Sequence, residues 1–193
     1  MLQTATTPAE KLQPRRASLN YIGSKHTLLP FIETVIMETV GDVSALTFAE
    51  PFAGTGVIAR HFKGRAKKVI VNDLEVYSYI LNRNYIGNNV AFDSDDLIET
   101  LATIEGVEGL IYKHYCLGGG TGRQYFSDTN GKKIDAIRQQ IEIWHQDKVI
   151  TEDYYYFLLA SLLESADRVA NVASVYGAYL KHLKKTAQKL LQL

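Results

Sequence analysis

The stretch from Phe48 to Phe62, FAEPFAGTGVIARHF, constrains the fold of this chain more than any other. An apolar run ends in an acid and a proline, two glycines follow one residue apart, and an apolar segment with helical spacing comes next. A strand that passes through a glycine turn into a helix leaves backbone N–H groups free, and glycine lets a ligand approach that backbone closely. The stretch therefore predicts a strand–turn–helix unit whose turn is suited to a ligand.

The glycine spacing alone leaves three interpretations open. Residues 54–59, GTGVIA, fit the dinucleotide pattern GxGxxA, and Asp73 follows at a distance where an acid can accept both hydroxyls of a ribose. An NAD site, an S-adenosylmethionine site and a plain strand-to-helix turn all agree with this pattern. Residues 50–52, Glu-Pro-Phe, precede the first glycine and favour S-adenosylmethionine, because an acid at the end of the strand suits its sulfonium and ammonium groups.

The first half of the chain alternates between short strands and helices. Strands are expected over 45–50, as a short buried strand, and over 67–72. The helices expected in this half cover 24–40, 54–63 and 74–87. This order is typical of parallel strands joined by right-handed crossovers, and so of an α/β fold.

The second half is predicted to be mainly helical. A loop, with room for a short hairpin, is expected over 117–131. The helices expected here cover 134–146, 152–170 and 173–192. The domains predicted for the whole chain are a flexible arm over 1–18, a cofactor-binding α/β part over 19–92 and a mainly helical lobe over 93–193.

Several stretches, found in the same order along the chain, resemble motifs of the DNA adenine methylase family. The members of this family are N6-adenine-specific DNA methyltransferases. The stretches are residues 20–25 (NYIGSK), 49–56 (AEPFAGTG), 71–75 (VNDLE), and 123–142 with 166–181. The resemblance covers most of residues 19–185. It implies a Rossmann-like S-adenosylmethionine-dependent methyltransferase core with an incomplete sheet, and an inserted helical lobe that recognises double-stranded DNA.

The resemblance also implies the residues of a cofactor pocket. These are Lys25, Glu50, Phe52, Gly54, Gly56 and Asp73, with Tyr21 packed beside them. An ammonium such as that of Lys25 at a helix start can reach a carboxylate or phosphate, but a lone lysine is more commonly a solvated surface group. For Glu50 the simpler alternative is a solvated loop acid.

Candidate DNA contacts lie around the glycine-rich loop of the second half. They are Arg123, Tyr125, Lys132 and Lys133, where basic groups suit phosphates and an aromatic ring suits insertion beside a flipped base. The alternatives are solvated helix faces for the lysines and a small core under the loop for Tyr125. The formal net charge is zero, so a uniformly basic coat is absent and any DNA contact must be local.

The family's catalytic motif, Asp/Asn-Pro-Pro-Tyr/Phe, is not found in this sequence. Its four prolines, at positions 8, 14, 30 and 51, are never adjacent. No catalytic residue is therefore assigned. We expect a second polypeptide to supply the motif, or the chain to be a fragment that transfers no methyl groups alone. The alternative is a non-catalytic DNA-binding or assembly subunit of a restriction-modification system. An NAD-type oxidoreductase is disfavoured by residues 50–52.

The remaining composition excludes other kinds of site. Cys116 is the one cysteine, so no disulfide forms within the chain, and a lone cysteine makes no zinc site. The five histidines show no metal-ligand spacing, and no metal is expected. No apolar run is long enough to cross a bilayer. The expectation is a cytoplasmic protein.

Overall fold

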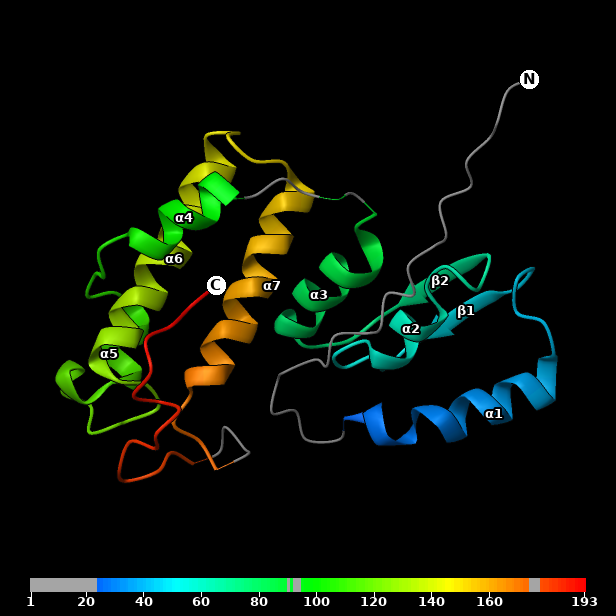
Figure 1. Cartoon of the computed structure of the whole chain (residues 1–193), viewed down its shortest axis with the longest axis horizontal. Coiled ribbons are helices and arrows are strands. Elements are labelled where there is room, and N and C mark those ends of the chain that lie inside the picture. Colours follow the sequence, from blue (N-terminus) through cyan, green and yellow to red (C-terminus); the bar gives the residue numbers. More distant parts are fainter. Residues whose placement is uncertain (1–23, 90, 92–94, 174–177) are drawn as a thin grey trace, which may run out of the picture.

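The computed structural model describes residues 24–89, 91, 95–173 and 178–193 (Figure 1). Tyr21, the predicted arm over 1–18 and most of the 20–25 motif lie outside these residues. Within the described parts, short strands and helices come first and a group of helices follows, as the sequence predicts. None of the helices described is both long and apolar enough to cross a membrane.

The first part is a small α/β unit. Its strands are β1 (Thr47–Glu50) and β2 (Lys68–Val71), which pair in parallel from Thr47–Lys68 to Glu50–Val71. Its helices are the 3-10 helix η1 (Lys25–Leu28), α1 (Leu29–Val40), α2 (Val57–Phe62), α3 (Val76–Asn82) and the π-helix η2 (Arg83–Gly87). The predicted parallel pairing and alternation are confirmed.

Only one face of this sheet is covered by the described residues. Phe48 of β1 and Val69 of β2 pack with α1 and α2 around the fully buried Phe62. On the other face Ala49 and Ile70 are exposed. The prediction of a buried strand at 45–50 is therefore wrong for its middle, because nothing described covers that side; only Glu50 at its end is buried.

The second part is built on two antiparallel helices, α6 (Asp128–Gln146) and α7 (Glu152–Val169). Fully buried Ile137, Ile141 and Leu158 form the centre of its core. Ser127 and Thr151 cap the two helices by accepting hydrogen bonds from Asn130 and Tyr154 backbone N–H groups. Around them lie α4 (Asp95–Thr103), α5 (Leu110–Tyr115) and the 3-10 helix η3 (Leu117–Gly119).

Two predictions about this half need correction. Residues 128–131, expected in a loop, form the first turn of α6, because the Ser127 cap starts the helix early. The helix expected over 173–192 is absent from its described part, 178–192, which is turns and extended chain. There the amides of Asn130 and Asn171 bind backbone groups between Leu180 and Leu191, replacing helical hydrogen bonds.

The two parts are joined along one side of α7. Figure 1 shows α3 lying beside α7, and the ring of Tyr79 on α3 meets Tyr156 on α7 edge to face with centroids 5.6 Å apart. Arg83 of η2 forms an ion pair with Asp153 at 2.5 Å, and Tyr85 donates a hydrogen bond to Glu164. The α/β unit is thus attached to the helical part through α3 and η2.

Candidate cofactor-binding site

The turn between β1 and α2 has the backbone shape for which glycine is suited. Gly54 and Gly56 both have left-handed φ angles, +55° and +74°. The Gly56 N–H donates to the Ala53 carbonyl at 2.8 Å, which closes the turn just before α2 begins. A side chain at either position would strain this backbone. The two glycines predicted for the pocket therefore have a structural requirement that the sequence pattern anticipated.

Asp73, at the end of β2, holds this turn from the side. Its Oδ2 accepts a hydrogen bond from the Gly54 N–H at 2.7 Å, and its Oδ1 accepts one from the Glu75 N–H at 3.1 Å. These backbone hydrogen bonds, from Glu75 first and then Gly54, lower the pKa of the Asp73 carboxyl. Asp73 is therefore an anion at the edge of the turn, and each carboxylate oxygen keeps lone pairs for a further donor.

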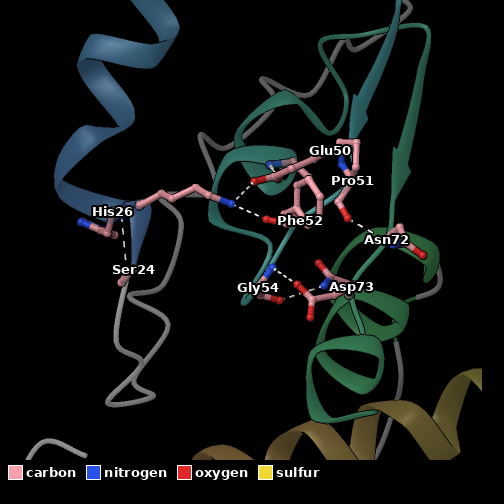
Figure 2. Close-up of polar contacts among 11 residues, drawn as sticks. Ser24, His26, Glu50, Pro51, Phe52, Gly54, Asn72 and Asp73 are labelled. Carbon is pink, nitrogen blue, oxygen red and sulfur yellow. Dashed lines mark hydrogen bonds and ion pairs between the residues drawn. The ribbon is translucent and has the colours of Figure 1, made fainter. Parts of the chain in front are cut away.

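Glu50 is fixed on the opposite side of the turn (Figure 2). Its Oε1 lies 2.8 Å from the Lys25 Nζ, and its Oε2 accepts a hydrogen bond from the Ala59 N–H at 3.0 Å in the first turn of α2. Lys25 also donates to the carbonyl of Phe52. Lys25 therefore connects the start of the first helix to the end of β1. The simpler alternative for Glu50, a solvated loop acid, is wrong, since Glu50 is buried.

Large apolar side chains stand exposed beside the turn. Phe52 is 81% exposed and Leu74, directly after Asp73, is 93% exposed. Apolar side chains this open, near an anionic carboxylate, can cover a flat ring whose polar part meets the carboxylate. Phe52 was among the residues predicted from sequence. Leu74 was not, although an apolar residue directly after the strand-end acid was a signal for it.

Asn82, the last residue of α3, lies underneath the turn and was also missed. Its Nδ2 donates to the Gly54 carbonyl at 3.0 Å and to the Ser78 carbonyl at 2.8 Å. It is a buried polar residue at the end of a short helix whose other residues, apart from Ser78, are apolar or aromatic. Nothing in the single sequence indicated which loop such a side chain would meet.

The candidate DNA residues fall into two separate groups. Arg123 lies with its guanidinium 5.9 Å from the ring of Tyr115, which also packs edge to face on Tyr125. Lys132, in contrast, pairs with Glu108 at 2.7 Å. Lys133 donates to the carbonyls of Ala102 and Ile104. Both lysines thus bind the end of α4 or the segment between α4 and α5, rather than the glycine-rich loop.

Tyr125 is half-buried rather than inserted into solvent. Its ring centroid lies 5.2 Å from that of Tyr179, and its N–H donates to the Tyr115 carbonyl at 2.9 Å. The three tyrosines make a small aromatic cluster under the glycine-rich loop. Across the described ranges, 24–89 and 95–193 with their gaps, no group of three or more His, Cys, Asp or Glu side chains is arranged to hold a metal ion.

The comparison with known families identifies the chain's relatives. The sequence model of the D12 class N6 adenine-specific DNA methyltransferases matches residues 21–193. The chain belongs to this family. The resemblance found from residues 20–25, 49–56 and 71–75 is thereby confirmed, and with it the assignment to a family of DNA methyltransferases.

Individual relatives agree with the family. The type II methyltransferase M.NlaIII of Neisseria lactamica is 57% identical over 177 residues, which are 91% of this chain and 53% of the relative. M.CviAII of Paramecium bursaria Chlorella virus 1 is 38% identical over 89% of this chain and 52% of its own length. M.FokI of Planomicrobium okeanokoites is 36% identical over 91% of this chain and 28% of its own length. The chain thus spans about half, or less, of the curated relatives it matches. No solved structure matches it.

Proposed function

We propose that this chain is the part of an adenine-N6 DNA methyltransferase that binds S-adenosylmethionine and recognises DNA. The observation that carries this proposal is the pair of anions that frames the glycine turn. Asp73 holds the Gly54 N–H from one side and Glu50 is fixed by Lys25 on the other. A methyl donor with a cationic sulfonium and a ribose diol has chemical groups that suit both carboxylates.

The residues of the turn fit such a ligand. The Asp73 carboxylate is positioned to accept hydrogen bonds from ribose hydroxyls, and its charge is maintained by the two backbone N–H groups it already binds. Phe52 and Leu74 offer exposed apolar surface to an adenine ring. Glu50 supplies negative charge near the cationic end, and Lys25 keeps its carboxylate in place. The bound cofactor would supply the methyl group.

Double-stranded DNA is the proposed substrate, and the helical part is proposed to contact it. Arg123 and Tyr125 lie together beside the glycine-rich loop, where a guanidinium can reach a phosphate. Lys132 and Lys133 remain proposed contacts, although each is already engaged by its own chain. Of the four residues, Arg123 has the exposed position that suits this role best.

A further polypeptide is proposed to complete the enzyme and to supply the catalytic motif. Two uncovered surfaces support this. The second face of the β1–β2 sheet exposes Ile70, whereas parallel sheets are normally covered on both faces. On α1, Phe31 is 68% exposed, and Val35 and the preceding Leu28 of η1 are also exposed; helical spacing puts them on the side away from Glu33, which meets α2. The relatives are about twice as long as the segment they share with this chain.

Calorimetric titration with S-adenosylmethionine tests the cofactor proposal. Binding in the micromolar range by the purified chain, lost in Asp73→Ala but kept in Asp147→Ala, is the expected result. Asp147 follows α6, far along the chain from the turn, and serves as the matched control. A chain that binds no S-adenosylmethionine, but still binds DNA, would instead favour a non-catalytic DNA-binding subunit.

Labelled methyl transfer tests the second polypeptide. The chain is incubated with DNA and radiolabelled cofactor, alone and with the separately expressed remainder of the Neisseria lactamica relative that this chain does not match. We expect label on adenine only when both are present. Robust labelling by the chain alone would overturn the need for a partner.

A further inference from the structure

We propose that Asn82 is a positioning residue of the cofactor turn, which sets the backbone at Gly54 and Gly56 from below without touching the ligand. The inference rests on the proposed function, because it assigns Asn82 a role in the same site. No sequence motif of the turn includes Asn82, which lies 28 residues beyond Gly54. It arises from three features of the structure: a pair of hydrogen bonds, a close approach and an unpaired oxygen.

The hydrogen bonds of Asn82 fix the orientation of one peptide group in the turn. Its Nδ2 donates one hydrogen to the Gly54 carbonyl and the other to the Ser78 carbonyl, and both partners are acceptors only. The side-chain amide therefore has one possible orientation. Asp73 holds the N–H of Gly54, so the two peptide groups that meet at this glycine are each held by a side chain.

Because peptide groups are planar, the hydrogen bond from Asn82 to the Gly54 carbonyl also fixes the direction of the next N–H group. In a trans peptide the carbonyl and the following N–H point in opposite directions. Because the Gly54 carbonyl points down to Asn82, the N–H of Thr55 points away from α3. Glycine by itself would let this peptide rotate, since it has no Cβ to restrict φ and ψ. Asn82 removes that freedom and keeps N–H rather than carbonyl groups directed outward.

The close approach to Gly56 shows that Asn82 fills the space beneath the turn. A Cβ at position 56 would lie 2.1 Å from the Asn82 Oδ1 and 3.2 Å from its Cγ. Side chain and glycine are therefore complementary in shape. The same Oδ1 is buried and has no hydrogen-bond partner among the described residues.

The Asn82 Oδ1, which has no hydrogen-bond partner among the described residues, distinguishes a positioning role for Asn82 from a packing role. A buried acceptor without a partner lowers stability, and an apolar side chain of the same size would fill the space without that penalty. Packing alone thus gives no reason for an amide here. Its two N–H donors give the reason, since only they can hold the Gly54 carbonyl.

The test compares Asn82→Asp and Asn82→Leu with Ser78→Ala. The aspartate keeps the size and shape but loses the donors, and the leucine keeps the branching at Cγ, with a larger volume, without adding a buried charge. Ser78, one turn earlier on the same helix, has a buried hydroxyl without a partner among the described residues, so its removal is a matched control. S-adenosylmethionine affinity is measured by calorimetry, and backbone amide exchange is followed residue by residue.

Both Asn82 variants are expected to bind the cofactor at least tenfold more weakly, with Ser78→Ala within twofold of the wild type. Amide exchange at Gly54 and Gly56 should accelerate in the Asn82 variants, while exchange at Ile137 and Ile141 in the helical core stays unchanged. If Asn82→Leu binds as tightly as the wild type, the role of Asn82 is overturned and the cofactor site stands. Exchange that accelerates equally throughout the chain would show a structural role only. A wild-type chain that binds no cofactor overturns both proposals.

Discussion

The Nζ of Lys25 lies 2.8 Å from the Oε1 of Glu50, across 25 residues of sequence. The same carboxylate accepts the Ala59 N–H through its other oxygen. One buried acid therefore joins the first helix, the end of β1 and the start of α2. The glycine turn lies between these elements, so its shape depends on contacts made outside the turn itself.

The two bonds of Glu50 differ in their expected contribution to stability. Lys25→Met removes an ion pair whose lysine is about one-third exposed but keeps the hydrogen bond from Ala59, and should lower the free energy of unfolding by less than Glu50→Ala does. Glu50→Ala leaves the buried Ala59 N–H without its acceptor and should cost about 1–3 kcal/mol. Urea denaturation of both variants measures the difference. Equal losses would mean that the ion pair, rather than the hydrogen bond to α2, dominates.

Gly56→Ala should destabilise the chain more than Gly64→Ala. Both glycines have left-handed φ angles, +74° and +80°, so each substitution costs about 1 kcal/mol in the backbone. At position 64 a Cβ meets nothing within 4 Å, whereas at 56 it meets Asn82 at 2.1 Å. Overpacking at 56 should add about 1–3 kcal/mol. Thermal unfolding of the two variants side by side is the measurement, and equal melting temperatures would contradict the close approach.

The single cysteine should make stability fall at high pH. Burial, assisted by the charges of Asp128 and Asp135, raises the pKa of the Cys116 thiol to about 12, against about 8.5 in an unfolded chain. The folded state thus keeps a proton that the unfolded state loses. The stabilisation is fully present below about pH 8.5 and is lost as pH rises toward 12, by at most about 1.4 kcal/mol per pH unit.

Comparison with Cys116→Ala isolates this thiol from other groups that titrate in the same range. The stability difference between wild type and variant, from denaturant unfolding at pH 8 and pH 10, should shrink at the higher pH. The native thiol should also resist alkylation at pH 8, because it is fully buried, and react once urea unfolds the chain. Rapid alkylation of the native protein would place the thiol at the surface instead.

Charge reversal at Arg123 should weaken DNA binding. Arg123 is exposed beside Tyr115, and losing one phosphate contact should reduce the slope of log affinity against log salt by about 1. Lys148→Glu, at the turn between α6 and α7, carries the same charge change away from that loop and is the control. Fluorescence anisotropy over a salt series gives both slopes. An equal effect of the two variants would indicate a general charge effect rather than a contact by Arg123.

The sequence predicted the parts of the fold that depend on local pattern. The strand–turn–helix at Glu50 to Phe62, the parallel pairing with β2 and the helix α7 all follow from apolar periodicity and from glycine. The structure of the segment after Val172 does not follow from such a pattern. The side-chain amides of Asn130 and Asn171 bind backbone groups of this segment, which replaces the hydrogen bonds of a helix. Those contacts join residues up to 61 positions apart, which no local pattern indicates.

In the candidate site, too, residues in a local pattern could be predicted and residues brought together by the fold could not. Gly54, Gly56 and Asp73 belong to a short-range pattern, and in the structure Asp73 lies beside the turn and accepts the Gly54 N–H. Their role in binding a cofactor stays a prediction. Leu74 and Asn82 were missed for different reasons. Leu74 is an ordinary apolar residue until its exposure is seen, and Asn82 acquires its importance only when α3 folds under the turn. Side chains that orient backbone from a distance are the part of a site that a single sequence conceals most.

The bare flank of α1 has a consequence for how the chain behaves in a cell. Phe31 and its apolar neighbours face water beside a sheet with one open side, which is the kind of surface that chaperones hold and that crowded chains aggregate through. We expect longer exposure of this flank after synthesis to lower the yield of native protein on expression, independently of the intrinsic stability of the helical part.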